Sequence, residues 1–94
     1  MGATGTLERS LYAKETERRL QADPTDRDAL FASASLVAAK REFTRAIYLL
    51  NLLGELDPKY PGLWRFKARV YREAGDRRME RRCLIAADRQ EMGP

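Results

Sequence analysis

The chain has 94 residues, a formal net charge of +4, an apolar fraction of 44% and a charged fraction of 34%. This length suits one small domain, and no apolar run approaches the roughly 18 residues of a membrane-spanning helix. Histidine is absent and Cys83 is the single cysteine, which removes the commonest general acid/base and any intramolecular disulfide. We therefore expect a cytoplasmic protein that is not an enzyme and carries no cofactor.

The charge is unevenly distributed along the chain. Residues 1–58 carry a net charge of −1, whereas residues 59–94 carry +5, mostly as arginine. Arginine is suited to binding carboxylates and phosphates, because its planar guanidinium donates two parallel hydrogen bonds. The C-terminal part is therefore the basic end of the molecule.

Periodicity, breakers and capping residues predict an all-α fold of five antiparallel helices, at about 6–22, 26–40, 43–56, 61–74 and 77–90. Residues 1–5 and 91–94 are expected to be flexible ends of one domain over 6–90. Thr6 is the expected N-cap of the first helix, and Asp23-Pro24 ends it. The apolar stripe of this helix is thin and consists of Leu7, Leu11, Tyr12 and Leu20.

Local signals mark the later helices as well. Thr25 or Asp26 can cap the second helix, Pro61 is expected at the first position of the fourth, and Gly75-Asp76 supplies a C-cap followed by an N-cap. The helix at 43–56 is apolar around well over half of its circumference, which predicts that it lies at the centre of the core. Its apolar residues are Phe43, Ala46, Ile47, Leu49, Leu50, Leu52, Leu53 and Leu56.

The chain contains an internal repeat. Asp57-Pro58 follows Asp23-Pro24 by 34 residues, and Trp64 follows Leu30 at the same step. At this register the chain resembles the tetratricopeptide repeat family, whose pattern is W-x2-L-G-x2-Y, then A-x3-F, then P. The matching residues are Trp64, Ala68 and Tyr71 for the first part, and Ala46, Leu50 and Pro58 for the second. The resemblance covers two repeats, about 27–60 and 61–94, and the helix at 6–22 by position only.

Three residues depart from the family pattern. Ser33 and Lys67 stand where leucine is expected, and Glu80 stands where a small residue is expected. Lys67 points towards the apolar side of its helix, and an unpaired buried ammonium is costly. Either Lys67 pairs with Glu80 across the two helices, or its ammonium reaches solvent along its own stem.

The resemblance implies a right-handed helical solenoid that binds a peptide or helix of a partner protein on its concave face. The residues that it places on this face are Phe31 and Ser35, beside Asp28 and Ala38, in the first repeat, and Arg65, Arg69 and Arg72 in the second. The three arginines are spaced i, i+4, i+7, so an acidic segment is the expected partner. The alternative is an ordinary solvated helix face.

Other functions remain open from the sequence. The chain could be a small dedicated subunit or chaperone of a larger complex. An array of fewer than three repeats also favours binding to a partner or a homodimer, and the expected contact is the helix 6–22 or the concave face. A second basic cluster, Arg77, Arg78, Arg81 and Arg82, suggests either a polar end to the array or nucleic-acid binding. Glu80 and the lack of nearby aromatic residues make nucleic acid the weaker alternative, and no membrane partner is expected.

Overall fold

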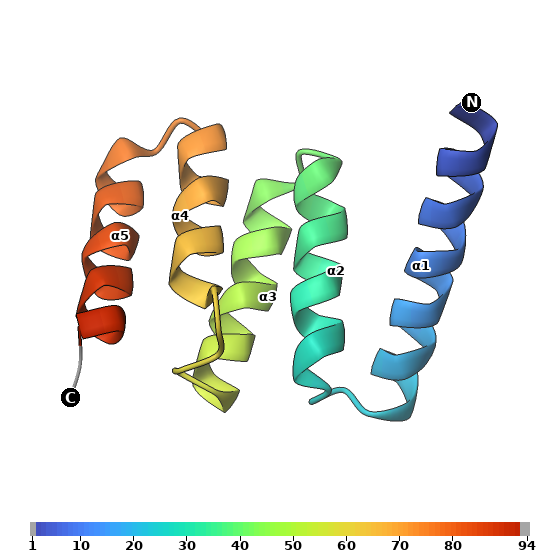
Figure 1. Ribbon diagram of the computed structural model, residues 1–94, viewed down its shortest axis with the longest axis horizontal. Helices are drawn as coiled ribbons and strands as arrows, with labels where there is room; N and C mark the ends of the chain where they lie inside the picture. Colours follow the sequence, from blue (N-terminus) through green and yellow to red (C-terminus); the bar gives the residue numbers. More distant parts are fainter. Residues whose placement is uncertain (1, 93–94) are drawn as a thin grey trace.

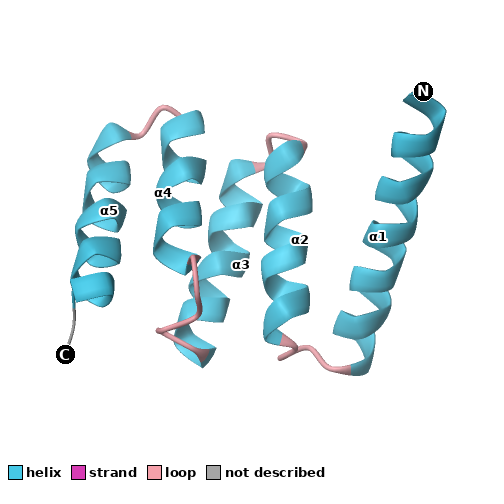
Figure 2. Cartoon of the chain, viewed as in Figure 1, coloured by secondary structure: helices cyan, strands magenta, loops and turns pink. Residues whose placement is uncertain are grey.

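The computed structural model describes residues 2–92, with side chains from residue 10 onward. These residues form five helices and no strand: α1 (Gly2–Ala22), α2 (Arg27–Ala39), α3 (Phe43–Leu56), α4 (Leu63–Glu73) and α5 (Arg77–Met92). Short turns join the helices (Figure 2). The helices follow one another across the molecule in chain order, each antiparallel to the one before (Figure 1). The prediction of an all-α chain with five helices is confirmed for the described residues.

Some helix ends differ from the expectation. α1 begins at Gly2, so residues 2–5 are helical and Thr6 lies inside the helix rather than at its N-cap. α4 begins at Leu63, because the chain enters it through Gly62 in the left-handed region, with φ 80°. Pro61 is therefore part of the preceding turn. α5 continues to Met92, and the last two residues of the expected tail, 93–94, lie outside the described residues.

The other predicted caps are present. The Asp26 carboxylate accepts a hydrogen bond of 3.0 Å from the Ala29 N–H, and the Asp76 carboxylate accepts one of 3.1 Å from the Met79 N–H. Gly75 adopts the left-handed conformation, with φ 85°, which glycine tolerates because it has no Cβ. These contacts satisfy backbone donors that a helix start leaves without an internal partner.

The core is centred on α3, as the sequence predicts. Ala46, Leu50 and Leu53 are completely buried, and α3 contacts α2 on one side and α4 on the other. The buried residues that form the core cluster around them are Leu30, Ala34, Val37, Ala38, Leu63 and Val70. A helix apolar on two sides buries both of them, which is why α3 occupies the middle of the row.

Buried positions recur at the 34-residue step. Ala34 on α2 and Ala68 on α4 are both buried, and so are Leu53 on α3 and Ala87 on α5. The most extensive helix contacts are those of α2 with α3 and of α4 with α5. The described chain is thus built from two antiparallel helix pairs with matching buried positions, and α1 packs against the first of them.

Among the described side chains, those of α1 are the least covered. Its C-terminal end is attached to the α2 N-terminus by an ion pair of 2.9 Å between Arg19 Nε and Asp26 Oδ2. Towards its N-terminus α1 leans away from α2 (Figure 1), and Leu11 and Tyr12 are 57% and 53% exposed. None of the helices in the described part of the chain combines the length and apolarity that a bilayer crossing requires.

Candidate functional site

A shallow hollow of about 220 Å³ lies between the first helices of the two pairs. We call it the α2–α4 groove. Its lining residues are Ser35, Ala38 and Ala39 from α2, and Phe66, Arg69, Val70 and Glu73 from α4. Two of the predicted partner-binding residues, Ser35 and Arg69, therefore come together in one groove. The α2 wall of the groove consists of small side chains, which is why the space is not filled. The longer side chains of α4 form the opposite wall.

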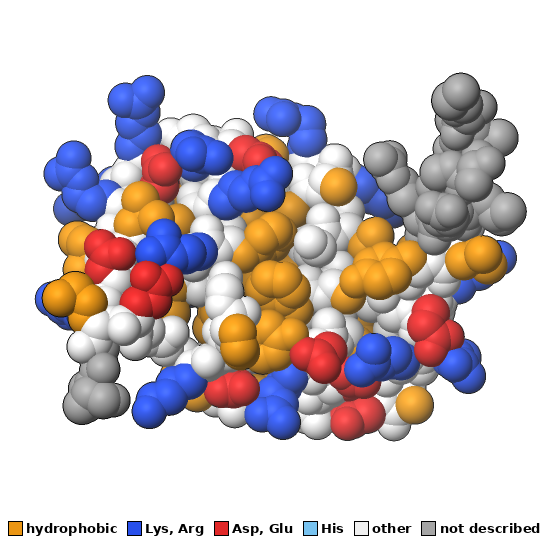
Figure 3. Space-filling view, in the orientation of Figure 1, with side chains coloured by type: hydrophobic (Ala, Val, Ile, Leu, Met, Phe, Trp, Pro, Cys, Tyr) orange, Lys and Arg blue, Asp and Glu red, His pale blue; other side chains and the backbone are white. Residues whose placement is uncertain are grey.

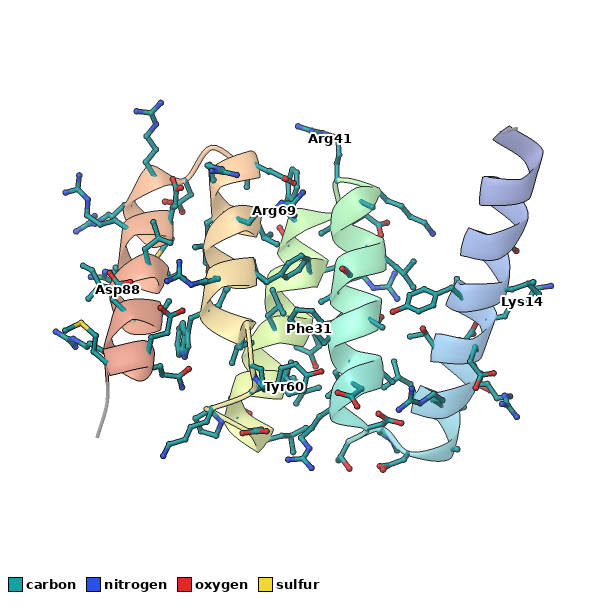
Figure 4. The ribbon with its side chains drawn as sticks, viewed as in Figure 1. Lys14, Phe31, Arg41, Tyr60, Arg69 and Asp88 are labelled. Carbon is teal, nitrogen blue, oxygen red and sulfur yellow. The ribbon has the colours of Figure 1, made fainter. Side chains whose placement is uncertain are left out.

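Phe31 lies between α2 and α4 (Figure 4) but does not line the α2–α4 groove. Its ring lies 5.2 Å from the Phe66 ring and 5.3 Å from the Tyr60 ring, measured between centroids. Tilted aromatic pairs at this spacing are favourable beyond the area that they bury. Phe31 is half-buried, so most of its surface joins the two helix pairs and only the remainder is left for a partner.

Arg65 lies apart from the α2–α4 groove. Its Nε and Nη2 atoms donate to the two carboxylate oxygens of Glu91 on α5, at 2.6 and 2.7 Å, and Nη2 lies 3.6 Å from Asp88 Oδ1. The hydrogen bond from Arg65 holds the pKa of Glu91 below its ordinary value. Arg65 lines a separate hollow between α4 and α5. The structure therefore does not gather the three predicted arginines in one groove.

Arg69 and Arg72 remain on the open side of α4. Arg69 Nε lies 3.3 Å from Glu73 Oε1, one turn along the same exposed helix face. Exposed pairs of this kind contribute little and exchange readily with other partners. Arg72 is exposed and forms no ion pair with any described side chain. Arg69 lines the α2–α4 groove and Arg72 does not, so Arg69 is the cation that α4 places in the groove, and Arg72 stands about one turn further along the helix.

Lys67 does not form the predicted ion pair with Glu80, and its ammonium is not fully exposed to solvent. No Lys67–Glu80 ion pair occurs, and both residues are half-buried. The Lys67 ammonium instead lies 4.7 Å from the centroid of the Trp64 ring, one turn earlier on α4. A cation over an aromatic face is stabilised by the negative charge of that face. This local contact explains how α4 accommodates a lysine beside the core.

The sequence reading missed an acidic hollow at the edge where α1 meets α2 and α3 meets α4. It has a volume of about 680 Å³ and is lined by Asp23, Thr25, Asp26, Arg27, Asp28, Leu56, Asp57, Tyr60 and Pro61. The repeated Asp-Pro turns are the signal that could have revealed it, because a 34-residue step brings equivalent turns to the same edge. Its carboxylates are largely engaged, since Arg19 pairs with Asp26 and Arg27 with Asp57.

Tyr60 belongs to both the acidic hollow and the aromatic contact. Its hydroxyl donates a hydrogen bond to the Asp28 carboxylate. Burial, and then this bond and the charge of Asp28, raise the pKa of Tyr60 to about 12. Tyr60 precedes α4 and Asp28 lies on α2, so this bond joins the two helix pairs directly.

The described residues offer little else for chemistry. No group of three or more metal-ligating side chains comes together among them. Cys83 is buried, and burial raises the pKa of its thiol, which lowers the thiolate fraction at neutral pH.

No protein-family model matches this chain, and a search of the curated proteins finds no similar sequence.

Proposed function

We propose that this chain is a protein-interaction module similar to the tetratricopeptide repeats, which holds a segment of a partner protein in the α2–α4 groove. On this proposal, the pairs α2–α3 and α4–α5 are successive turns of a right-handed solenoid, and α1 is the second half of a preceding unit. The observation that carries the proposal is the groove itself. Two helices that stand one 34-residue step apart, α2 and α4, line it together.

The groove chemistry favours a short segment that has an apolar side and a carboxylate. Ala38, Ala39 and Phe66 offer apolar contact, and the Ser35 hydroxyl can donate or accept a hydrogen bond. Arg69 and Arg72 stand on the α4 side with weak or no internal partners, so a carboxylate of the ligand can replace Glu73 as the partner of Arg69. An acidic peptide or helix is therefore the proposed ligand.

Capture of partners from the native cell, with paired variants, tests the proposal. The double variant Arg69→Glu and Arg72→Glu should lose the captured protein, because it replaces the groove cation Arg69 and the neighbouring cation Arg72 with carboxylates that repel an acidic ligand. The matched control is Arg45→Glu and Lys59→Glu, which makes the same change in net charge at exposed positions outside the α2–α4 groove and should leave capture intact. Unchanged capture by the groove variant, with circular dichroism showing a folded chain, would sink the proposal.

A second candidate is a dedicated subunit or chaperone of one larger complex, or a homodimer. The observation in its favour is the pair of adjacent apolar side chains, Leu11 and Tyr12, that α1 leaves more than half exposed. Sedimentation of the isolated chain separates these possibilities: a dimer dissociated by Leu11→Ser and Tyr12→Ser supports self-association through α1. We place the protein in the cytoplasm, where a lone thiol such as Cys83 stays reduced.

A further inference from the structure

The outer side of α5 carries a cluster of arginines around exposed aliphatic side chains. We call it the α5 ridge, and its residues are Arg77, Arg78, Arg81, Arg82, Ile85, Arg89 and Met92, all of them exposed. Figure 3 shows basic and apolar side chains together at the edge of the molecule that α5 occupies. The ridge shares no residue with the α2–α4 groove.

The ridge is unfavourable for α5 on its own. None of its five arginines forms an ion pair with a described side chain, and the nearby carboxylates Asp88 and Glu91 are both engaged by Arg65. Arg77 and Arg78 stand at the helix N-terminus, where the helix dipole disfavours cations. Each also has a like charge four residues later, at Arg81 and Arg82, which is a destabilising spacing. Helix stability therefore does not explain these residues.

The preceding helix pair provides an internal comparison. The residues 34 positions before Arg78, Arg82, Ile85 and Arg89 are Thr44, Tyr48, Asn51 and Glu55 on α3. All four are exposed as well, but none is cationic. A helix in this place in its pair thus needs no cation at these positions, so Arg78, Arg82 and Arg89 point to an external anion. Arg77 and Arg81 extend the cluster at positions where α3 has Phe43 and Ile47, which pack against the core.

The shape and the apolar centre of the ridge restrict what that anion can be. The hollow between α4 and α5 is lined by none of the ridge residues, so the ridge lies outside it, on the exposed side of α5. Ile85 and Met92 are 46% and 85% exposed, and they lie two turns apart with arginines on both sides. Phosphates alone gain nothing from these aliphatic side chains, whereas a bilayer surface takes both kinds of group.

We propose that the α5 ridge binds the surface of an anionic lipid bilayer. α5 then lies along the headgroups, its guanidiniums bind lipid phosphates, and Ile85 and Met92 enter the upper acyl region. The expectation that no membrane is a partner rests on the lack of a spanning segment, and a surface contact requires none. The proposal is independent of a ligand in the α2–α4 groove.

Co-sedimentation of the full chain with vesicles tests the ridge. The chain should bind phosphatidylcholine vesicles containing about 30% phosphatidylglycerol, and not pure phosphatidylcholine vesicles. Arg78→Gln, Arg82→Gln and Arg89→Gln together should weaken binding about 100-fold, since each cation near an anionic surface contributes about fivefold. Ile85→Ser should weaken it severalfold with the charge unchanged. The control Lys40→Gln, Arg41→Gln and Arg45→Gln removes the same charge from the α2–α3 region and should have a much smaller effect.

Three outcomes would overturn the proposal. The first is no binding to the phosphatidylglycerol vesicles at low salt. The second is an equal loss in the ridge variant and the control, which would indicate a response to net charge alone. The third is binding to duplex DNA that exceeds vesicle binding and is unchanged by Ile85→Ser, which would assign the ridge to nucleic-acid phosphates. Circular dichroism of each variant shows whether the chain is folded.

Discussion

The two helix pairs, α2–α3 and α4–α5, differ in how deeply they bury the same position of the 34-residue step. Leu50 on α3 is completely buried, whereas Leu84, which stands 34 residues later on α5, is 38% exposed. α3 lies between α2 and α4, while α5 has an extensive contact with α4 alone among the described helices. Burial at this position is thus decided by the helix that follows, not by the pair itself.

The side chains at another matching position of the two pairs, residues 31 and 65, also differ. Phe31 on α2 packs its ring against the tilted ring of Phe66 in the next pair, whereas Arg65, its counterpart on α4, pairs with Glu91 on α5. An aromatic residue suits a position with a neighbour ahead of it, and an ion pair suits one that faces water. The comparison indicates that contact between pairs, and not only contact within a pair, holds this small protein together.

The largest expected difference is between two leucine truncations. Leu50→Ala should cost about 3 kcal/mol of unfolding free energy, because it leaves a cavity in a closed core, and Leu84→Ala should cost less than about 1 kcal/mol. Urea unfolding of both variants measures this. Equal losses would mean that α5 is covered as fully as α3.

The next difference concerns the contact between the pairs. Phe31→Ala should cost about 2 kcal/mol, since the half-buried ring loses two aromatic neighbours. Arg65→Ala should change stability only slightly, because its ion pairs with Glu91 and Asp88 are exposed. Thermal unfolding of the two variants compares them, and a larger loss for Arg65→Ala would contradict the assignment of Arg65 to a surface role.

A smaller effect is expected at the turns inside the pairs. Arg41 and Gly75 stand at equivalent positions and both adopt the left-handed region, with φ 64° and 85°. A side chain there costs about 1 kcal/mol, so Gly75→Arg should destabilise by about this amount and Arg41→Gly should stabilise by less than that. Urea midpoints that move in the opposite directions would show that the two turns are not equivalent.

The weakest effect should appear at alkaline pH. The folded-state pKa of Tyr60, about 12, lies above its ordinary value of 10.0, so the unfolded chain loses this proton first. The stability that Tyr60 contributes is present below pH 10.0 and declines as the pH rises towards about 12. Unfolding of the wild type and of Tyr60→Phe at pH 8 and pH 11 should show part of the decline missing in the variant. An identical decline would exclude the titration of Tyr60 as its source.

Local patterns in the sequence predicted the parts of the structure that depend on local physics. The caps at Asp26 and Asp76, the turn at Gly75 and the burial of α3 all follow from residues within one or two turns. The position of Arg65 does not, because it depends on Glu91, which is 26 residues away on another helix. The acidic hollow also combines aspartates from separate turns, and the signal that relates these turns is the 34-residue step between the two Asp-Pro pairs. The start of α1 at Gly2 has no capping signal in the sequence.

Site-specific photocrosslinking tests the central proposal most directly. A benzoylphenylalanine at Ser35 lies in the α2–α4 groove, and one at Asn51 lies on the exposed side of α3. In the native cell, the Ser35 probe should crosslink one partner protein, and the variant Arg69→Glu with Arg72→Glu should abolish that product. Crosslinking of the same protein from Asn51 and not from Ser35 would contradict the proposal that the groove is the binding site.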